Sequence, residues 1–267
     1  MRSTRGLRAA LVAAAAAALL AGCSGVAQAA PAPTVTPAPI PSGPPGDGVL
    51  RIGALVPMTG DHANEGAAQL AGIELAVREI NEAGGVLGAR VEVYARDSGD
   101  AGSAIAETSF GELAARGADA VVGPSDPVLA GRLLPLAASS AIALVSPTVT
   151  DDDVPGGDPG GWLLGVSRVF AEPEAAWRTT EAFHSRLLVS DPGLDVVRTG
   201  GEAYDATMLA ALAAIAADDD GGAAIASVLP RTVAGPLPCA TFGECTAVLA
   251  AGQDPAYAGV TGVPAAG

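Results

Sequence analysis

Few side chains in this sequence are arranged for catalysis. The two histidines, His62 and His184, lie far apart, and neither has a nucleophile beside it in a recognisable motif. GxSxG, HExxH and a GxGxxG segment after a strand are absent, and a phosphate-binding loop with its lysine is excluded because the chain has no lysine. We therefore expect a protein that is not an enzyme and that needs no cofactor.

The charge balance excludes a second class of function. The chain of 267 residues has 29 acidic residues and 14 basic ones, all of them arginine, and a formal net charge of −15. A protein that binds nucleic acid needs a cationic face to neutralise phosphates. We therefore expect no nucleic-acid partner.

The N-terminus has the pattern of a secretion signal. Three arginines fall within the first eight residues, and a continuous apolar stretch covers residues 9–21. The stretch is too short to span a membrane as an ordinary helix, but it suits the apolar core of a signal peptide. It ends in Leu-Ala-Gly-Cys, which resembles the bacterial lipobox. This resemblance implies cleavage after residue 22 and acylation of Cys23, which would anchor the chain to the outer face of the cell membrane.

Residues 23–48 form the next segment, which is rich in Pro, Ala, Thr, Ser and Gly. Such a composition cannot bury a core, so we expect a semi-extended tether between the membrane and a domain at 49–267. An ordinary signal peptide, cleaved at Ala-Gln-Ala-Ala (27–30), is the alternative.

Cys239 and Cys245 lie six positions apart near the C-terminus. Outside the cytoplasm a pair of cysteines tends to oxidise, which favours a local disulfide. Metal binding is the weaker interpretation because two cysteines without a nearby histidine are too few ligands. We expect no metal site.

Apolar runs alternate with helical patterns from residue 49 onward. Leu70, Ile73, Val77 and Ile80 recur at helical spacing, and Gly84-Gly85 is expected to end this helix in a left-handed conformation. Strands are expected at 51–57, 90–95, 118–124 and 142–147, with helices within 66–85, 97–117 and 125–140. This alternation predicts an α/β fold, a doubly wound parallel sheet with helices on both faces.

Ligands of doubly wound sheets bind beyond the carboxyl ends of the strands, near helix N-termini. In this sequence those positions are 58–66, 97–100, 123–127 and 146–152. We expect the binding residues to come from these four loops.

The sequence ALVPMTGDHANEGAAQLAGIELAVREINEAGGVLGARVEV, followed by DSGD, VVGP and VSPTVT, resembles ABC-transporter substrate-binding proteins of the leucine/isoleucine/valine type. The resemblance runs through residues 50–150. A second stretch of similarity covers 201–213 and 239–262. It implies a type I periplasmic-binding-protein fold, in which a ligand binds one lobe and a second lobe closes over it.

This chain has too few residues for the second lobe that members of that family contain. Segment 160–170 is similar to the point where family members enter the second lobe, and 171–194 looks like the helix that returns to the first. Several further strand–helix units would need far more residues than lie between Phe170 and Tyr204. We therefore expect a single lobe, with the second largely absent.

The resemblance also implies which residues contact the ligand. The family uses a hydroxyl residue after the third strand and an S-P-x-x-T turn after the fourth. In this sequence Pro127 stands where the family has the hydroxyl residue, and the nearest hydroxyl, that of Ser125, lies two positions earlier. The S-P-x-x-T turn corresponds to Ser146, Thr148 and Thr150. Glu65 lies where many members have an aromatic residue, and it is either a cation-binding group or a solvated carboxylate.

Structural roles for several of these residues stay open. Ser146 and Thr150 could cap the turn before the acidic run 151–153, and Asp100 is expected to be the N-cap of the following helix rather than a ligand group. Tyr204 is expected in the core. The sequence does not decide whether Trp162 and Trp177 are core or interface residues.

The sequence thus predicts an extracytoplasmic solute-binding lipoprotein of an ABC importer. Its expected partners are a small amino acid or related polar solute and the subunits of a membrane permease. The alternative is a single-lobe lipoprotein that binds a protein partner, or acts as a sensor input, without transport.

Overall fold

The computed structural model describes residues 40–166, 170–171, 181–194 and 198–264. The chain from Ala38 onward forms one compact unit. The predicted signal peptide, Cys23, most of the tether and Trp177 lie outside the described residues. Among the described helices, none is long and apolar enough to cross a membrane.

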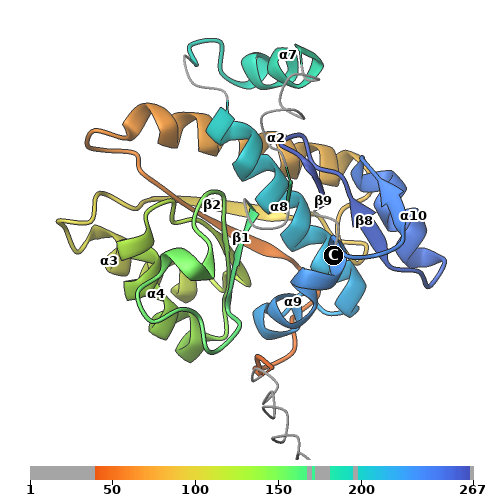
Figure 1. The fold of residues 1–267 in the computed structure, drawn as a ribbon, viewed down its shortest axis with the longest axis horizontal. Helices are drawn as coiled ribbons and strands as arrows, with labels where there is room; N and C mark the ends of the chain where they lie inside the picture. The colour runs from red at the N-terminus through yellow and green to blue at the C-terminus, as the bar shows by residue number, and fades with distance from the viewer. Residues whose placement is uncertain (1–39, 167–169, 172–180, 195–197, 265–267) are drawn as a thin grey trace, which may run out of the picture. The chain divides into compact units, whose positions relative to one another are not determined.

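A five-stranded parallel sheet lies at the centre of this unit (Figure 1). Its strands have the order β2-β1-β3-β4-β5, and every neighbouring pair is parallel. The strands are β1 (Arg51–Val56), β2 (Glu92–Asp97), β3 (Ala120–Val122), β4 (Ala143–Ser146) and β5 (Leu163–Gly165). The second strand thus lies two residues later than expected, because the chain makes a tight turn at 86–89 before it enters the sheet.

Helices cover both faces of the sheet. On one face α2 packs against β1, β2 and α8, while α8 packs against β3 and β4. On the other face α3 and α4 pack against each other, α3 over β1 and β2 and α4 over β4. The helices are α2 (Ala63–Glu82), α3 (Ile105–Ala115), α4 (Pro127–Ser140) and α8 (Arg198–Ala217). The predicted fold class, α/β and doubly wound, is confirmed.

The two glycines after α2 have the backbone conformation that the sequence predicts. Gly84 has a φ of 113° and Gly85 a φ of 80°, and the Gly85 N–H donates to the carbonyl of Ile80. These left-handed residues satisfy carbonyls at the end of the helix and turn the chain back toward β2. The helix itself begins three residues before the predicted segment, at Ala63.

Small residues allow α2 and α8 to approach closely. A Cβ at Gly72 would lie 2.0 Å from the carbonyl oxygen of Gly200, so any larger residue would push the two backbones apart. The buried part of α8 includes the alanine-rich stretch 210–214, Ala-Ala-Leu-Ala-Ala, in which every residue is fully inaccessible. An alanine-rich core of this kind gains its contacts from short distances between helices rather than from large side chains.

The C-terminal part adds smaller elements beside α8. The strands β7 (Leu237–Cys239) and β8 (Pro255–Tyr257) pair in parallel, and β6 (Phe170–Ala171) pairs with β9 (Val263–Pro264) in antiparallel orientation. The helical elements are α7 (Glu181–Ser190), α9 (Gly222–Val228), η2 (Leu229–Thr232) and α10 (Phe242–Ala250), and η1 (Asp151–Asp153) precedes β5. A disulfide between Cys239 and Cys245 joins β7 to α10.

A single buried carboxylate attaches the final segment to α8. Asp205 is completely buried and accepts hydrogen bonds from the Tyr257 hydroxyl (2.8 Å), the Val260 N–H (3.0 Å), and the N–H (3.0 Å) and hydroxyl (2.5 Å) of Thr261. Four donors satisfy a charge that would otherwise be costly to bury. Tyr204, one residue earlier, is also buried, in agreement with the prediction of a core position.

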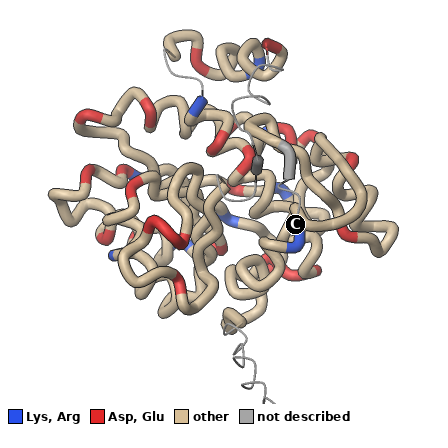
Figure 2. Tube along the Cα trace, viewed as in Figure 1, with Lys and Arg blue, Asp and Glu red and all other residues tan. Residues whose placement is uncertain are grey.

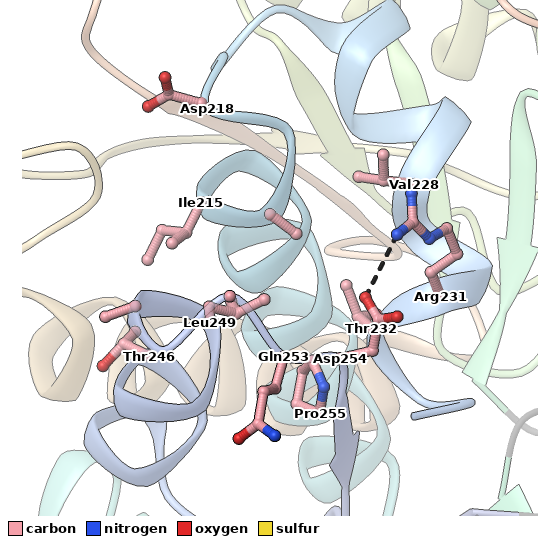
Figure 3. A pocket seen from close by; sticks show the side chains of 13 residues that line it. Ile215, Asp218, Val228, Arg231, Thr232, Thr246, Leu249, Gln253, Asp254 and Pro255 are labelled. Atoms are coloured by element: carbon pink, nitrogen blue, oxygen red, sulfur yellow. Dashed lines mark hydrogen bonds and ion pairs between the residues drawn. The ribbon is translucent and has the colours of Figure 1, made fainter. Parts of the chain in front are cut away.

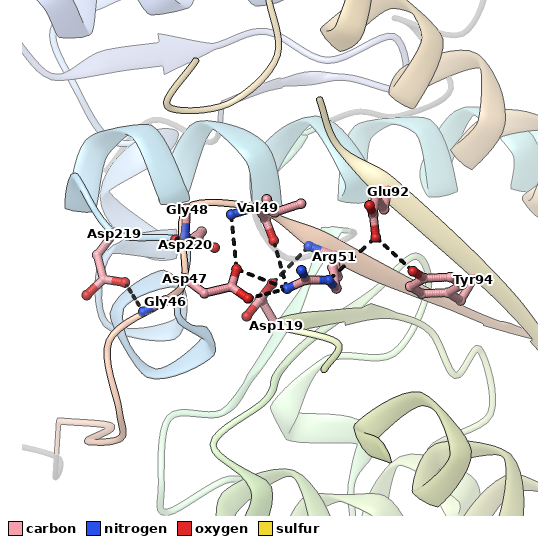
Figure 4. A network of polar contacts seen from close by, with 10 residues as sticks. All are labelled: Gly46, Asp47, Gly48, Val49, Arg51, Glu92, Tyr94, Asp119, Asp219 and Asp220. Atoms are coloured by element: carbon pink, nitrogen blue, oxygen red, sulfur yellow. Dashed lines mark hydrogen bonds and ion pairs between the residues drawn. The ribbon is translucent and has the colours of Figure 1, made fainter. Parts of the chain in front are cut away.

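The entrance of the chain into the sheet is held by carboxylates at the amino ends of the strands (Figure 4). The Gly46 N–H donates to Asp219 (2.7 Å), the Gly48 N–H to Asp220 (2.9 Å) and the Arg51 N–H to Asp119 (2.8 Å). Residues 46–51 are therefore bound to the domain at the edge opposite to the carboxyl ends of the strands.

Candidate functional site

A cavity of about 420 Å³ lies at the carboxyl ends of the strands. It is lined by residues from three loops and by the first turns of α2 and α4. The lining residues are Pro57, His62 and Glu65 after β1, residues 98–102 after β2, and Ser125, Asp126 and Leu129 after β3. The parallel register brings these segments together, as the sequence predicts for such a sheet.

Asp97 ties the first two loops to each other. Its carboxylate accepts hydrogen bonds from the Met58 N–H (2.9 Å), the Thr59 hydroxyl (2.5 Å) and the Gly99 N–H (2.8 Å). Burial by itself would raise the pKa of Asp97, but the bonds from Thr59, Gly99 and Met58 together lower it. Asp97 thus stays ionised and supports the cavity wall from behind.

Arg132 of α4 holds the loop after β2. Its guanidinium donates to the carbonyls of Ala101 (3.0 Å) and Ser103 (2.7 Å) and pairs with Glu107 of α3 (2.8 Å). Within the loop, the Asp100 carboxylate accepts from the Gly102 N–H (2.9 Å). The prediction that Asp100 caps the following helix is wrong, because the turn at 100–103 delays the helix and places Ala104 at its N-cap.

Ser125 lies in the cavity wall, and a buried glutamine positions its hydroxyl. The Nε2 of Gln69, on α2, donates to the Ser125 oxygen at 2.8 Å, and Gln69 is fully buried. With its oxygen accepting this bond, the hydroxyl of Ser125 can donate its proton toward the cavity. The Gln69 Oε1 has no hydrogen-bond partner among the described residues. Nothing in the local sequence distinguishes Gln69 from a solvent-facing residue of α2.

The structure does not bring the residues of the S-P-x-x-T turn into the cavity wall. Ser146 is fully buried, where its hydroxyl donates to the Pro124 carbonyl (2.6 Å) and accepts from the Val149 N–H (2.9 Å). Thr150 donates its N–H and its hydroxyl to Asp153, both at 2.8 Å, at the start of η1. The hydroxyl of Thr148 donates to the Ser125 carbonyl (3.1 Å).

These bonds give Ser146 and Thr150 the turn-capping roles that the sequence analysis left open. Thr148 fixes the backbone of Ser125. The polar residues that line the cavity are instead His62, Glu65, Ser125, Asp126 and those of the loop after β2.

Carboxylates occupy the two helix N-termini beside the cavity. Glu65 lies in the first turn of α2, with an oxygen 3.3 Å from Nδ1 of His62. Asp126 caps α4, accepting from the Val128 N–H (2.8 Å) and the Leu129 N–H (3.0 Å). Figure 2 shows how acidic residues outnumber basic ones along the described chain.

A second cavity, of about 450 Å³, lies between the C-terminal part of α8, η2 and α10 (Figure 3). Arg231 and Asp254 form an exposed ion pair (3.2 Å) on its rim. None of its described lining residues belongs to a loop that follows a strand of the five-stranded sheet. The cavity at the carboxyl ends is therefore the better candidate for the functional site.

Two solved structures share this fold at low sequence identity. The branched-chain amino acid transporter substrate binding protein LivJ from Streptococcus pneumoniae, in complex with isoleucine, is 16% identical over 80% of this chain and 91% of that chain, with a TM-score of 0.53. A substrate-binding periplasmic protein from Ralstonia solanacearum is 12% identical over 74% of this chain and 94% of that one, with a TM-score of 0.51.

A leucine binding protein, LivK, from Thermotoga maritima is 20% identical, but the match covers 59% of this chain and 45% of that one, with a TM-score of 0.35. A comparison with curated protein sequences finds no significant match. The family assignment comes from a sequence model for the periplasmic binding protein family, which matches residues 49–183, half of the chain. This chain, with its parallel sheet of type I topology, belongs to the periplasmic binding protein family.

Proposed function

We propose that the chain is a solute-binding lipoprotein of an ABC importer. It binds a small amino acid or a related polar solute and presents it to a membrane permease. The observation that carries the proposal is the cavity at the carboxyl ends of β1, β2 and β3 in a member of the periplasmic binding protein family. Membership in this family implies an extracytoplasmic location. The isoleucine in the S. pneumoniae structure makes amino acids the first class of solute to test.

The size and chemistry of the cavity support a small ligand. A volume of about 420 Å³ lies within the range of small-molecule sites. Ser125 supplies a hydroxyl donor and Glu65 a carboxylate, so we propose these two side chains as the direct contacts. Ser146, Thr148 and Thr150 then act one step away, by fixing the loops that carry Ser125.

A single lobe has consequences for how the solute is held. The described residues contain one five-stranded sheet, and its carboxyl edge ends in an open cavity. A site open on one side buries less of its ligand and gains less affinity than one enclosed by two lobes. We propose that a second surface, from the permease or from another copy of the chain, covers the bound solute.

Calorimetric titration of the full chain in mild detergent tests this function. We expect micromolar binding of one member of a panel of amino acids and small organic acids. Ser125→Ala should weaken that binding about tenfold, the worth of one hydrogen bond in a desolvated site. Ser139→Ala, an exposed serine near the other end of α4, is the matched control and should leave it unchanged. No heat from any solute, on a chain with a normal unfolding transition, would overturn the transport function.

Exposed apolar side chains next to the cavity favour the alternative function, binding of a protein partner. Met58 and Val128 follow the carboxyl ends of β1 and β3 closely, and they are 37% and 49% exposed. A partner that docks on this edge would bury both. Under this alternative the same titrations would show no solute binding.

A further inference from the structure

Ser125, in the wall of the candidate cavity, is fixed by three other side chains. Its hydroxyl oxygen accepts a hydrogen bond from Nε2 of Gln69 (2.8 Å), and its carbonyl accepts one from the Thr148 hydroxyl (3.1 Å). The carbonyl of the preceding residue, Pro124, accepts from the Ser146 hydroxyl (2.6 Å). Helix α2 and the chain that follows β3 on the sheet therefore determine both the backbone position and the side-chain direction of Ser125.

The bond from Gln69 limits what the hydroxyl of Ser125 can do. A serine hydroxyl has one proton to donate and two lone pairs that accept. The amide nitrogen of Gln69 only donates, so it occupies a lone pair of Ser125 and leaves the hydroxyl proton free to point elsewhere. Among the described residues no group accepts a hydrogen bond from this hydroxyl. The cavity wall therefore has a donor that the protein itself does not satisfy.

Neighbouring donors of the described wall are already engaged. Ser98, the other serine of the described lining, is buried, and its hydroxyl donates to the carbonyl of Gly99 (3.2 Å). The N–H groups of Val128 and Leu129 at the start of α4 donate to Asp126. Ser125 thus differs from these groups, because its proton is available to a solute.

A solute in the cavity replaces the water around Ser125, so the type of group that it places there matters. An oxygen acceptor takes the hydroxyl proton and keeps the hydrogen bond that water provided. An ammonium or an apolar group leaves that proton without a partner, which weakens binding. The wall at Ser125 therefore favours a solute with an acceptor at this position.

The direction of the bond between Gln69 and Ser125 decides this preference. Gln69 is fully buried on α2, so solvent does not compete for its carboxamide and packing restricts its side chain. If the carboxamide were reversed, its oxygen would accept the proton of Ser125, and the hydroxyl would offer only lone pairs to the cavity. The same serine would then favour a solute that donates, such as an amine.

We propose that Gln69 is a specificity-determining residue that acts through Ser125, and that the solute presents an oxygen acceptor, a carboxylate or a carboxamide, to the Ser125 hydroxyl. Gln69 is a positioning residue, because it sets the direction of this bond and is not among the residues that line the cavity. The inference rests on the proposed solute-binding function and narrows its substrate class.

Solutes paired with their decarboxylated analogues test the preference for an acceptor. The pairs are L-isoleucine and 2-methylbutylamine, L-phenylalanine and phenethylamine, L-lysine and cadaverine, and 4-hydroxybenzoate and phenol. The amides of the three amino acids separate a carboxamide from a carboxylate. In calorimetric titrations of the full chain in mild detergent, the acid or amide that binds should do so roughly tenfold or more tightly than its analogue.

The outcomes of these titrations separate the inference from the proposed function. Tighter binding of an amine or of phenol, or equal binding within a pair, would overturn the acceptor preference and leave the solute-binding function intact. Binding of none of these probes, on a chain with a normal unfolding transition, would overturn both.

A double-mutant cycle tests whether Gln69 acts through Ser125. Gln69→Met keeps the length of the side chain and removes the donor. With the solute that binds best, this substitution should weaken binding about fivefold in the parent, but less than about twofold in a Ser125→Ala background. Equal weakening in both backgrounds would show that Gln69 acts only by packing and would overturn its role.

Gln253→Met is the matched control, since Gln253 is exposed and lies outside the candidate cavity. It should leave the affinity unchanged in both backgrounds. Thermal unfolding of each variant shows that the titrated protein is folded. If Gln69→Met does not fold, the paired titrations of the parent chain still decide the direction of the Ser125 hydrogen bond.

Discussion

The half-buried carboxyl group of Asp119 makes the stability of the fold depend on pH. It lies just before β3 and accepts a hydrogen bond from the Arg51 N–H at the start of β1. Burial raises its pKa from 3.8 to about 7, and the charge of Asp220 adds to this effect, while the bond from Arg51 opposes it. The folded chain therefore binds a proton on Asp119 that the unfolded chain releases above pH 4.

The sign of this effect predicts a loss of stability with rising pH. Because the folded pKa is raised, the contribution of Asp119 is fully present below pH 3.8 and lost as the pH rises through about 7. Asp119→Asn keeps an oxygen for the Arg51 N–H but cannot ionise. We expect the variant to be more stable than the parent at pH 8, by on the order of 1 kcal/mol because Asp119 is partly screened by solvent. Urea unfolding at pH 5 and pH 8 measures the difference.

Glu74→Gln is the control for that experiment, since Glu74 is exposed on α2. It should follow the parent at both pH values. If Asp119→Asn also follows the parent, Asp119 does not titrate with folding and the pH dependence comes from another group.

At the scale of the elements, the contact between α2 and α8 depends on the absence of side chains. Gly72 lies against the backbone of Gly200, and the Cβ position of Gly200 lies 2.8 Å from the Ala68 carbonyl oxygen. Backbone atoms cannot move aside as a side-chain tip can. The packing of α8 over β3 and β4 therefore depends on two glycines that the helical pattern by itself would mark as weak points.

Two glycine substitutions with opposite expected signs test this contact. Gly72→Ala should destabilise the protein by about 1–3 kcal/mol, because the new methyl group forces the helices apart. Gly111→Ala, in α3, meets nothing within 4 Å and should stabilise it by about 0.5–1 kcal/mol through the lower entropy of the unfolded chain. Denaturant unfolding of both variants gives the two values. A stable Gly72→Ala protein would show that α2 and α8 can separate without loss.

The protein combines a predicted membrane anchor with a folded domain. In this domain the chain enters the sheet at one edge, and the cavity lies at the opposite edge. Residues 46–51 are bound at the amino ends of the strands by Asp119, Asp219 and Asp220. The cavity lies at the carboxyl ends. Residues 46–51 and the cavity therefore lie at opposite edges of the sheet.

Membrane attachment through Cys23 is a testable part of this arrangement. We expect the parent chain, expressed in a bacterial host that processes lipoproteins, to incorporate labelled palmitate and to fractionate with membranes. Cys23→Ser should lose the label, because the acylated thiol is gone. The double variant Cys239→Ser, Cys245→Ser, which removes only the disulfide, should keep it. Labelling of the Cys23→Ser protein would contradict the predicted lipidation site.

Local patterns predict the elements of this protein well, because each depends on residues close in sequence. The apolar runs become β1, β3 and β4, and the glycine pair after α2 ends that helix as expected. The prediction for Asp100 failed because a carboxylate can accept from N–H groups in a turn as readily as at a helix start. Sequence spacing does not distinguish these two local bonds.

The candidate site is less predictable because its assignments depend on distant partners. The contact of Gln69 with Ser125 joins helix α2 to the loop after β3, and the buried Ser146 takes its partner from the same loop. The carboxylate of Asp205 lies on the buried helix α8, and only the tertiary structure shows that Tyr257 and Thr261 donate hydrogen bonds to it. These bonds join residues that the sequence places far apart.

By itself, the sequence determined the succession of the first four strands and their helices and the parallel sheet, and it predicted the edge of the sheet at which the candidate cavity lies. These follow from hydrophobic periodicity and from the chirality of strand–helix connections. Only the tertiary structure decided which polar side chains line the cavity and which form hydrogen bonds that fix the loops around it. The physical reason is that a hydroxyl or a carboxylate can form only a few hydrogen bonds. The packing of segments that are distant in sequence decides whether those bonds are made to the protein itself or are left available to the cavity.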